Sequence, residues 1–280
     1  MRQYFCSPRL LYALAIYLWL VFPAYSAKPA ATANTAIAAM TWPEVAQSIK
    51  AGNTTIIIPI GGTEQNGAHM ALDKHNRRVN ILSERIALAL GNALIAPVVA
   101  YVPEGNINPP TGHMRYPGTI SISEAAFAGV LMGAANSFRQ AGFTDVVLLG
   151  DSGNYQSQLR QIAAQLNLQW ARLAKQKPPT SRVHFIAQYY VATQQQYVRL
   201  LRGKGLSTVD IGTHAAGADT SLMLALDASL VREDKLKNAA VNADGIGGDA
   251  RQSSAALGKL GVGVIVEETV EAIRQTVLKP

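Results

Sequence analysis

Four apolar stretches of the chain carry the residue pattern of buried β-strands. They are the runs TTIIIPI (54–60), ALIAPVVAYV (93–102), DVVLLG (145–150) and RVHFIAQYY (182–190). Continuous apolar runs are typical of strands that are covered on both faces of a sheet, whereas half-exposed strands alternate apolar and polar residues. The pattern therefore predicts a sheet without a solvent-exposed face.

Segments with helical spacing lie between and after these runs. Apolar residues recur every three or four positions in the segments 79–90 and 127–138, and Ser123 stands where the second helix needs a capping side chain. NYQSQLRQIAAQLNLQWA and VEETVEAIRQTVL are two further helical segments. Alternation of strand and helix predicts a mostly parallel sheet with helices on both faces, which is a three-layer α/β/α fold.

The first residues have the pattern of a secretory signal. Arg2 and Arg9 precede an apolar run over 10–22, and Ala24 and Ser26 have the spacing that a signal peptidase recognises. The apolar run is short for a membrane span, so we expect cleavage and no stable membrane insertion afterwards. The alternative is an uncleaved N-terminal anchor.

This interpretation divides the chain into a signal peptide (1–26), a flexible lead-in (27–39) and one α/β domain (40–280), and it predicts a periplasmic or secreted protein. The only cysteine, Cys6, lies in the signal, so the exported chain would have neither a disulfide nor a thiolate ligand. The formal net charge is +7, but no basic block is interleaved with aromatic residues, which argues against nucleic acid as a partner.

Polar side chains gather in three loops that follow the predicted strands or precede a helix. They are Glu64, Asn66, His69, Asp73 and His75 in GGTEQNGAHMALDKHN, then Asp151, Ser152 and Asn154 in GDSGN, then His214 and Asp219 in THAAGADTS. Ligands of open parallel sheets bind beyond the carboxyl ends of the strands, so these loops can share one cleft. Carboxylate and imidazole groups together can hold zinc, manganese or iron, and such an ion lowers the pKa of its water.

The order of these motifs resembles that of the creatininase family. TEQNGAHMALDKH, LGDSGN and HAAGADTS resemble three metal-site and substrate-site segments of that family, and HMRYPGTISIS and GIGGDARQSSAALGK resemble two more. The ordered resemblance covers roughly residues 40–277. It implies a creatininase-like α/β/α fold, hydrolysis of a C–N bond in a small and possibly cyclic amide, and a homo-oligomer, often a hexamer.

The resemblance also implies metal positions. The family usually holds two metals, and the ligands of one correspond to Glu64, His75 and Asp151, where Asp and His have exchanged places. The other metal has lost strong ligands at Asn66 and Gly153. We therefore expect one divalent ion, with zinc as the first choice and manganese or iron as alternatives.

Roles for the remaining polar residues follow from the same resemblance. Asp219 and His214 would relay protons to the leaving nitrogen, as the catalytic residues. The substrate-binding candidates are Asn66, His69, His113, Ser152 and Asn154. Two other functions stay open: a binding or scaffold protein that has lost catalysis on this fold, and a lactonase-type hydrolase.

Structural roles compete with several of these assignments. Glu64 could accept backbone N–H groups in its glycine-rich turn, and His75 or Asp151 could cap a helix. Asp73 fits a solvated turn, and His184 fits a histidine of the core or sheet edge. Metal content after purification would separate the enzyme from the binding protein.

Overall fold

The computed structural model describes Met1 and the ranges 34–174 and 181–277. The chain divides into two units, Met1–Ala33 and Asn34–Pro280, and every helix and strand named below belongs to the second. The expected signal peptide and the lead-in up to residue 33 lie outside the described residues. Within the described ranges, none of the helices has the length and apolar character needed to cross a bilayer.

The sheet has four parallel strands in the order β2-β1-β3-β4. Their bounds are Thr55–Ile60 for β1, Ala93–Ile95 for β2, Asp145–Gly150 for β3 and Arg182–Phe185 for β4. Every residue of β1 is buried, as are all but the first of β3. The predicted parallel sheet with two covered faces is confirmed.

Two strands are shorter than predicted. β2 ends at Ile95 because Pro97 lacks the N–H that would continue the ladder, and only Val99 pairs again, as an isolated bridge with Ile60. β4 ends at Phe185, and the chain then turns into α5 (Gln188–Val191). Ile186 and Tyr189 are buried although they lie outside the strand, which explains why the apolar run looked continuous.

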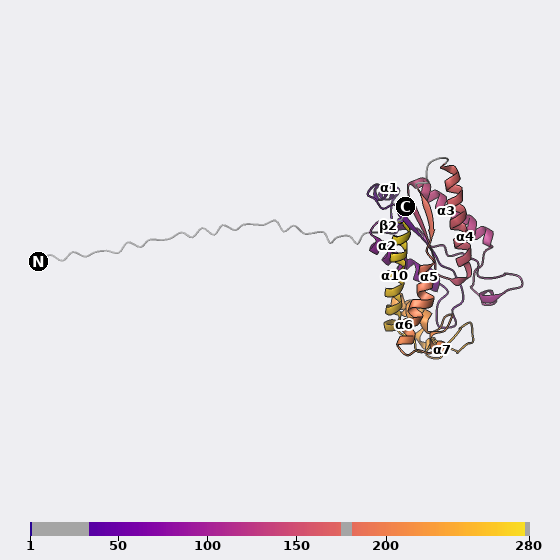
Figure 1. Cartoon of the computed structure of the whole chain (residues 1–280). Coiled ribbons are helices and arrows are strands. Elements are labelled where there is room, and N and C mark those ends of the chain that lie inside the picture. The colour runs from indigo at the N-terminus through magenta and orange to yellow at the C-terminus, as the bar shows by residue number, and fades with distance from the viewer. Residues whose placement is uncertain (2–33, 175–180, 278–280) are drawn as a thin grey trace. The chain divides into compact units, whose positions relative to one another are not determined.

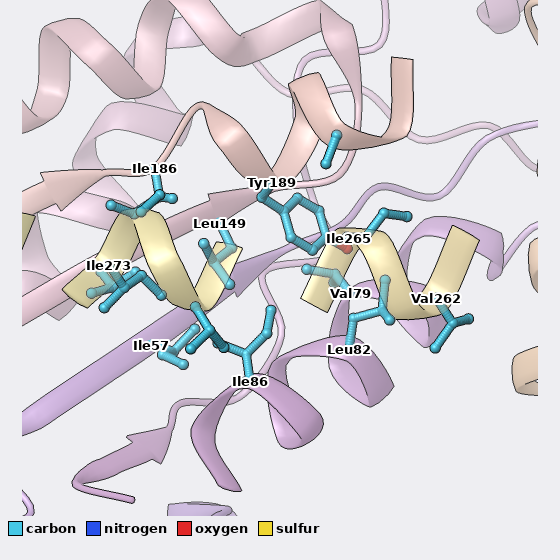
Figure 2. Packing of buried hydrophobic residues seen from close by; sticks show 14 of the residues in the cluster. Ile57, Val79, Leu82, Ile86, Leu149, Ile186, Tyr189, Val262, Ile265 and Ile273 are labelled. Atoms are coloured by element: carbon cyan, nitrogen blue, oxygen red, sulfur yellow. The ribbon is translucent and has the colours of Figure 1, made fainter. Parts of the chain in front are cut away.

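Helices cover both faces of the sheet (Figure 1). On one face, α2 (Lys74–Leu90) and α10 (Ala255–Val277) pack on Ile57 and Leu149. Figure 2 shows Val79, Leu82 and Ile86 of α2 meeting Ile265 and Ile273 of α10 over these strands. On the other face, α3 (Glu124–Ala141) and α4 (Gln156–Leu173) pack on alternate strand residues. The three-layer α/β/α fold is therefore confirmed.

Local signals fix several helix ends. The Ser123 hydroxyl accepts a hydrogen bond from the Ala126 N–H, as expected for the cap of α3. α2 begins at Lys74, five residues before the predicted segment 79–90, and ends at Leu90, where the following Gly91 has a left-handed φ of 80°. Residues 34–39, expected as lead-in, are ordered against the sheet, because Ala36 pairs with Ile95.

The remaining helices pack around these layers and complete the site. α8 (Gly217–Leu226) approaches α10 closely at Gly258, where an added Cβ would collide with the Ser221 carbonyl oxygen. This close packing fixes the amino end of α8 and therefore the position of Asp219. The other elements are α1 (Trp42–Lys50), η1 (Ile37–Ala39), η2 (Gly112–Arg115), η3 (Gly153–Tyr155), η4 (Ala192–Gln196), α6 (Tyr197–Gly203), α7 (Thr208–Ile211), η5 (Ala228–Leu230) and α9 (Glu233–Leu236).

Candidate functional site

A cavity of about 160 Å³ lies beyond the carboxyl ends of β1 and β3. Its wall is made almost entirely of polar side chains from the β1–α2 loop, the start of α2, η2, the loop after β3 and the start of α8. The predicted residues in this wall are Glu64, His75, His113, Asp151, Ser152, Asn154, His214 and Asp219. Parallel-sheet topology thus brings together most of the residues that the sequence singled out.

Glu64, His75 and Asp151 are adjacent, but His75 lies between the two carboxylates. Its Nε2 is 2.7 Å from Glu64 Oε1, and its Nδ1 is 2.6 Å from Asp151 Oδ2. Because carboxylates only accept hydrogen bonds, this geometry calls for a proton on both ring nitrogens. Burial and Lys74 lower the pKa of His75, but Glu64 and Asp151 outweigh them and raise it. A doubly protonated imidazole has no lone pair for a metal.

Two buried cations from α2 complete this cluster. Lys74 Nζ lies 3.2 Å from Glu64 Oε1 and 3.1 Å from Asp219 Oδ2. Arg78 Nε lies 2.8 Å from Asp151 Oδ2, and its Nη1 lies 2.7 Å from Asp219 Oδ1. The Lys74 and Arg78 side chains are only 1% and 3% exposed, so these ion pairs are screened little by water. We call Glu64, Lys74, His75, Arg78, Asp151 and Asp219 the inner network.

Opposite charges in the inner network keep Arg78 and Asp219 ionised despite burial. Burial opposes ionisation of Arg78, but Asp151 and Asp219 raise its pKa. Burial likewise opposes ionisation of Asp219, but Lys74 and Arg78 bring its pKa well below its usual range. The Ala215 N–H also donates to Asp219 Oδ2 at 2.9 Å. Asp219, predicted as a proton relay, is therefore held as an anion inside a set of donors.

Glu64 also faces two histidines on the cavity side. A ligand-capable atom of each of Glu64, His113 and His214 lies within 4.8 Å of the other two, close enough for one metal ion. His113 Nε2 is 3.4 Å from Glu64 Oε2, and His214 Nδ1 is 3.6 Å from Glu64 Oε1. The histidine side chains are 26% and 19% exposed, so solvent or substrate can reach them. We call these three residues the outer trio.

Gln65 orients both histidines of the outer trio. The Gly67 N–H donates to Gln65 Oε1, and Gln65 Nε2 donates to the Gly245 carbonyl, each at 2.9 Å, which fixes the amide orientation. The same Nε2 lies 2.9 Å from His113 Nδ1, so that nitrogen accepts and Nε2 carries the proton. His214 Nε2 lies 3.0 Å from the Gln65 carbonyl and donates to it, which leaves a lone pair on Nδ1 facing Glu64.

The two histidines of the outer trio are neutral at pH 7. Burial, with help from Lys74, lowers the pKa of His214 to about 3. Burial also lowers the pKa of His113, although Glu64 opposes the shift. Glu64 itself has a lowered pKa, because its cationic neighbours His75 and Lys74 outweigh the effect of burial. A carboxylate beside two neutral imidazoles is a donor set that suits a divalent ion.

Glu104 lies beside two site residues, Asn154 and Glu64, and the sequence did not reveal it. Its side chain is buried, the Asn154 amide donates to its Oε2 at 2.7 Å, and its Oε1 has no hydrogen-bond partner among the described residues. Burial, together with the charge of Glu64, raises the pKa of Glu104 to about 8. Glu104 is therefore a neutral carboxylic acid beside an ionised one. Its only sequence signal was an acid before Gly105 in a proline-rich loop.

Two predicted substrate-binding residues lie outside the cavity wall. Asn66 is fully buried and donates to the carbonyls of Glu64 and Ala71, which shapes the loop. His69 is fully buried, with Nε2 3.0 Å from the Thr220 hydroxyl oxygen. The structure therefore gives both residues interior positions, outside the cavity wall where we predicted them to bind substrate.

The structure also shows the surroundings of Asp73, His184 and Gly153. Asp73 is exposed at the start of α2, as expected for a solvated residue. His184 Nε2 pairs with Asp145 Oδ1 at 2.8 Å, a structural contact away from the cavity. A side chain at Gly153 would collide with the Tyr190 hydroxyl, so Tyr190 occupies the space beside this position. Sequence reasoning missed Lys74, Arg78 and Gln65 because such residues usually face solvent. It missed Tyr190 because the predicted strand 182–190 included this residue, which lies in α5.

The sequence of this chain is similar to a family model and to several known proteins. The sequence matches the Creatininase family model, described as creatinine amidohydrolase, over residues 38–273. It is 25% identical to creatinine amidohydrolase of Pseudomonas putida over 252 residues, which cover 84% of this chain and 95% of that protein. It is 29% identical to the mycofactocin precursor peptide peptidase of Mycolicibacterium smegmatis over 113 residues, 39% of this chain and 43% of that protein.

Solved structures agree on the fold. A crystal structure of creatinine amidohydrolase superposes with a TM-score of 0.73 at 22% identity, covering 89% of this chain and all of the other. A manganese form of creatininase gives 0.71 at 23% identity over 88% of this chain and 100% of that chain. A form described as Zn-Zn type gives 0.71 at 22% identity, with 88% and 99% covered. The family match over most of the chain, with the shared fold, shows that this chain belongs to the creatininase family.

Proposed function

We propose that this chain hydrolyses a C–N bond of a small polar amide, and that the outer trio is the reacting centre. The observation that carries the proposal is the convergence of Glu64, His113 and His214 in a cavity with polar walls. The family relatives described above are hydrolases, which supports the reaction class. The cavity volume of about 160 Å³ favours a small substrate group, and a cyclic amide is compact enough to enter.

The outer trio fits one divalent ion. His214 is a weak base at a pKa of about 3, so its neutral Nδ1 is better suited to be a metal ligand than a general base. When bound there, zinc, or alternatively manganese or iron, would supply an activated water for attack on the carbonyl carbon. To join Glu64 and His214 as a neutral ligand through Nε2, His113 would have to carry its proton on Nδ1, so the Gln65 amide that now donates to Nδ1 would have to turn away.

The cavity wall offers hydrogen bonds to an amide substrate. Asn154 presents its side-chain amide beside Glu104, and Tyr190, Gln194 and Thr213 also line the cavity. Such groups can bind the carbonyl oxygen and the leaving nitrogen and hold the scissile bond near the outer trio. In this proposal Asp219 positions Lys74 and Arg78 and does not move a proton itself.

Hydrolysis of a panel of amides tests the proposed reaction. Purified protein, stripped of metal and reloaded with zinc or manganese, should release amine or amino acid from linear or cyclic amides. The His214→Ala variant should lose this turnover and remain folded. Turnover of lactones with none of amides would support a lactonase instead, and no turnover with tight ligand binding would support a binding protein.

We also propose that the protein is exported and assembles with copies of itself. The pattern over 1–26 supports cleavage of a signal peptide and a periplasmic or secreted location. Protein recovered from the cell envelope or medium should begin at or near Ala27, and retention of Met1 would contradict cleavage.

Analytical ultracentrifugation should give a mass several times that of one chain, and a monomer would contradict the oligomer.

A further inference from the structure

The inner network pairs every carboxylate with a basic side chain. Three carboxylates, those of Glu64, Asp151 and Asp219, face the Lys74 amine, the Arg78 guanidinium and the His75 ring. Nearly every carboxylate oxygen already has a donor. Tyr189 Oη donates to Asp151 Oδ1 at 2.6 Å, while Arg78 and His75 occupy Oδ2.

We infer that Lys74 and Arg78 are built-in cations, which occupy the place that a divalent ion would take between Glu64, His75 and Asp151. The inner network then binds no metal, and the predicted ion, if present, binds at the outer trio alone. Lys74 and Arg78 would have this role whether or not the outer trio performs the hydrolysis proposed above.

Charge balance supports this assignment. Lys74 pairs with Glu64 and Asp219, and Arg78 pairs with Asp151 and Asp219, so these carboxylates already have cationic partners. A buried charge is tolerated only when it is paired, so a divalent ion between Glu64, His75 and Asp151 would have to displace Lys74 or Arg78 from its carboxylates. Lys74 and Arg78 are almost fully buried, which makes that displacement costly.

The position of the cations on α2 is a second, independent argument. Lys74 and His75 lie in the first turn of α2, where the helix dipole disfavours positive charge, and Arg78 lies in the second turn. Lys74 and Arg78 are four residues apart and therefore share one face, which is directed at the carboxylates. Arg77, between them, points away, is 46% exposed and pairs with Asp227. Cations against the dipole are stable here because the carboxylates of the inner network neutralise them.

A metal-binding titration in the full-length chain tests the inference. His113→Ala/His214→Ala removes the outer trio, so any ion that remains must bind elsewhere. Isothermal titration with MnCl2 should then detect no tight site, and the melting temperature should not respond to manganese or EDTA. Adding Arg78→Met to this variant leaves Asp151 and Asp219 without their cation. This triple variant should have a lower melting temperature and a new manganese site. Saturating manganese should therefore raise its melting temperature by about 5 °C.

Arg77→Met in the same background is the matched control. It removes an arginine from the same helix turn without touching the inner network, so it should create no manganese site. A tight manganese site in the His113→Ala/His214→Ala variant, lost on Asp151→Ala, would overturn the inference. If the Arg78→Met variant does not fold, the titration of the His113→Ala/His214→Ala variant decides alone, because it asks directly whether the inner network holds an ion.

Discussion

The inner network and the outer trio share Glu64 but differ in how fully their polar atoms are engaged. In the inner network, contacts of 2.6–3.2 Å join buried groups of opposite charge. In the outer trio, the distances from Glu64 to the histidines are 3.4 and 3.6 Å, and the histidines are partly exposed. A saturated cluster stabilises the fold, whereas an unsaturated cluster at a cavity is available to bind a ligand or an ion. Residue type alone therefore does not identify the reacting part of a site.

Removal of a histidine from the outer trio should have the largest effect. His214→Ala should lower kcat on the best amide by about 10³-fold, which is typical for loss of one group at a reacting centre. Its melting temperature should change little, because the side chain is partly exposed and lies at the cavity. Steady-state kinetics and thermal unfolding measure the two effects.

His184→Gln is the matched control, since His184 pairs with Asp145 away from the cavity. This variant should keep its activity per folded molecule. Equal losses of kcat in both variants would show that histidines act through stability alone and would remove the distinction between the outer trio and the rest of the protein.

Neutralisation of one inner cation should mainly affect stability. Arg78→Met leaves buried carboxylates without their partner, and such a change typically costs about 3–5 kcal/mol of unfolding free energy. Arg77→Met, which breaks a half-exposed pair with Asp227, should cost less than about 1 kcal/mol. Denaturant unfolding at pH 7 measures both. Similar small costs for the two arginines would contradict a structural inner network.

A substitution at Gln65 should weaken the outer trio without removing a member of it. Gln65→Ala removes the amide that holds the His113 ring in position beside Glu64, so kcat should fall by about 10–100-fold, as is usual when a supporting group is lost. The ¹⁵N chemical shifts of His113 should change from one tautomer to a mixture. An unchanged tautomer with reduced kcat would show that Gln65 acts in another way.

Glu104 gives the smallest expected effect. Folding raises its pKa from about 4.5 to about 8, so the folded state keeps a proton that the unfolded state loses, and stability falls as pH rises through this window. Glu104→Gln removes this penalty and should stabilise the protein by about 1 kcal/mol at pH 7, with no gain at pH 4. Unfolding at several pH values checks this, and a gain that does not vary with pH would contradict a neutral Glu104.

The sequence predicted the fold better than the site. The strands β1 and β3 and the helix α2 were clear because their apolar patterns are long and their neighbours are polar. The predicted strands at β2 and β4 were too long, because buried residues outside a strand, such as Tyr189, have the same apolar character as strand residues. The spacing of apolar residues cannot distinguish a strand from a helix when the segment is short.

The candidate site was predicted in composition but not in contacts. Glu64 and Asp151 were found because they follow strands whose ends must meet, and His113 and His214 were found because their segments resemble those of the family. Lys74 and Arg78 were missed because cations in a helical segment usually face solvent, and only tertiary packing buries these two. The role of His75 depends on which groups lie against its two nitrogens, and a sequence does not contain that information.

The most direct test of the central claim is anomalous diffraction from crystals of the wild-type protein soaked in MnCl2. The claim is that the inner network has its own cations and leaves only the outer trio open to an ion. The account predicts one anomalous peak beside Glu64, His113 and His214, with Lys74 and Arg78 still paired to their carboxylates. A peak between Glu64, His75 and Asp151, with Arg78 displaced, would contradict it.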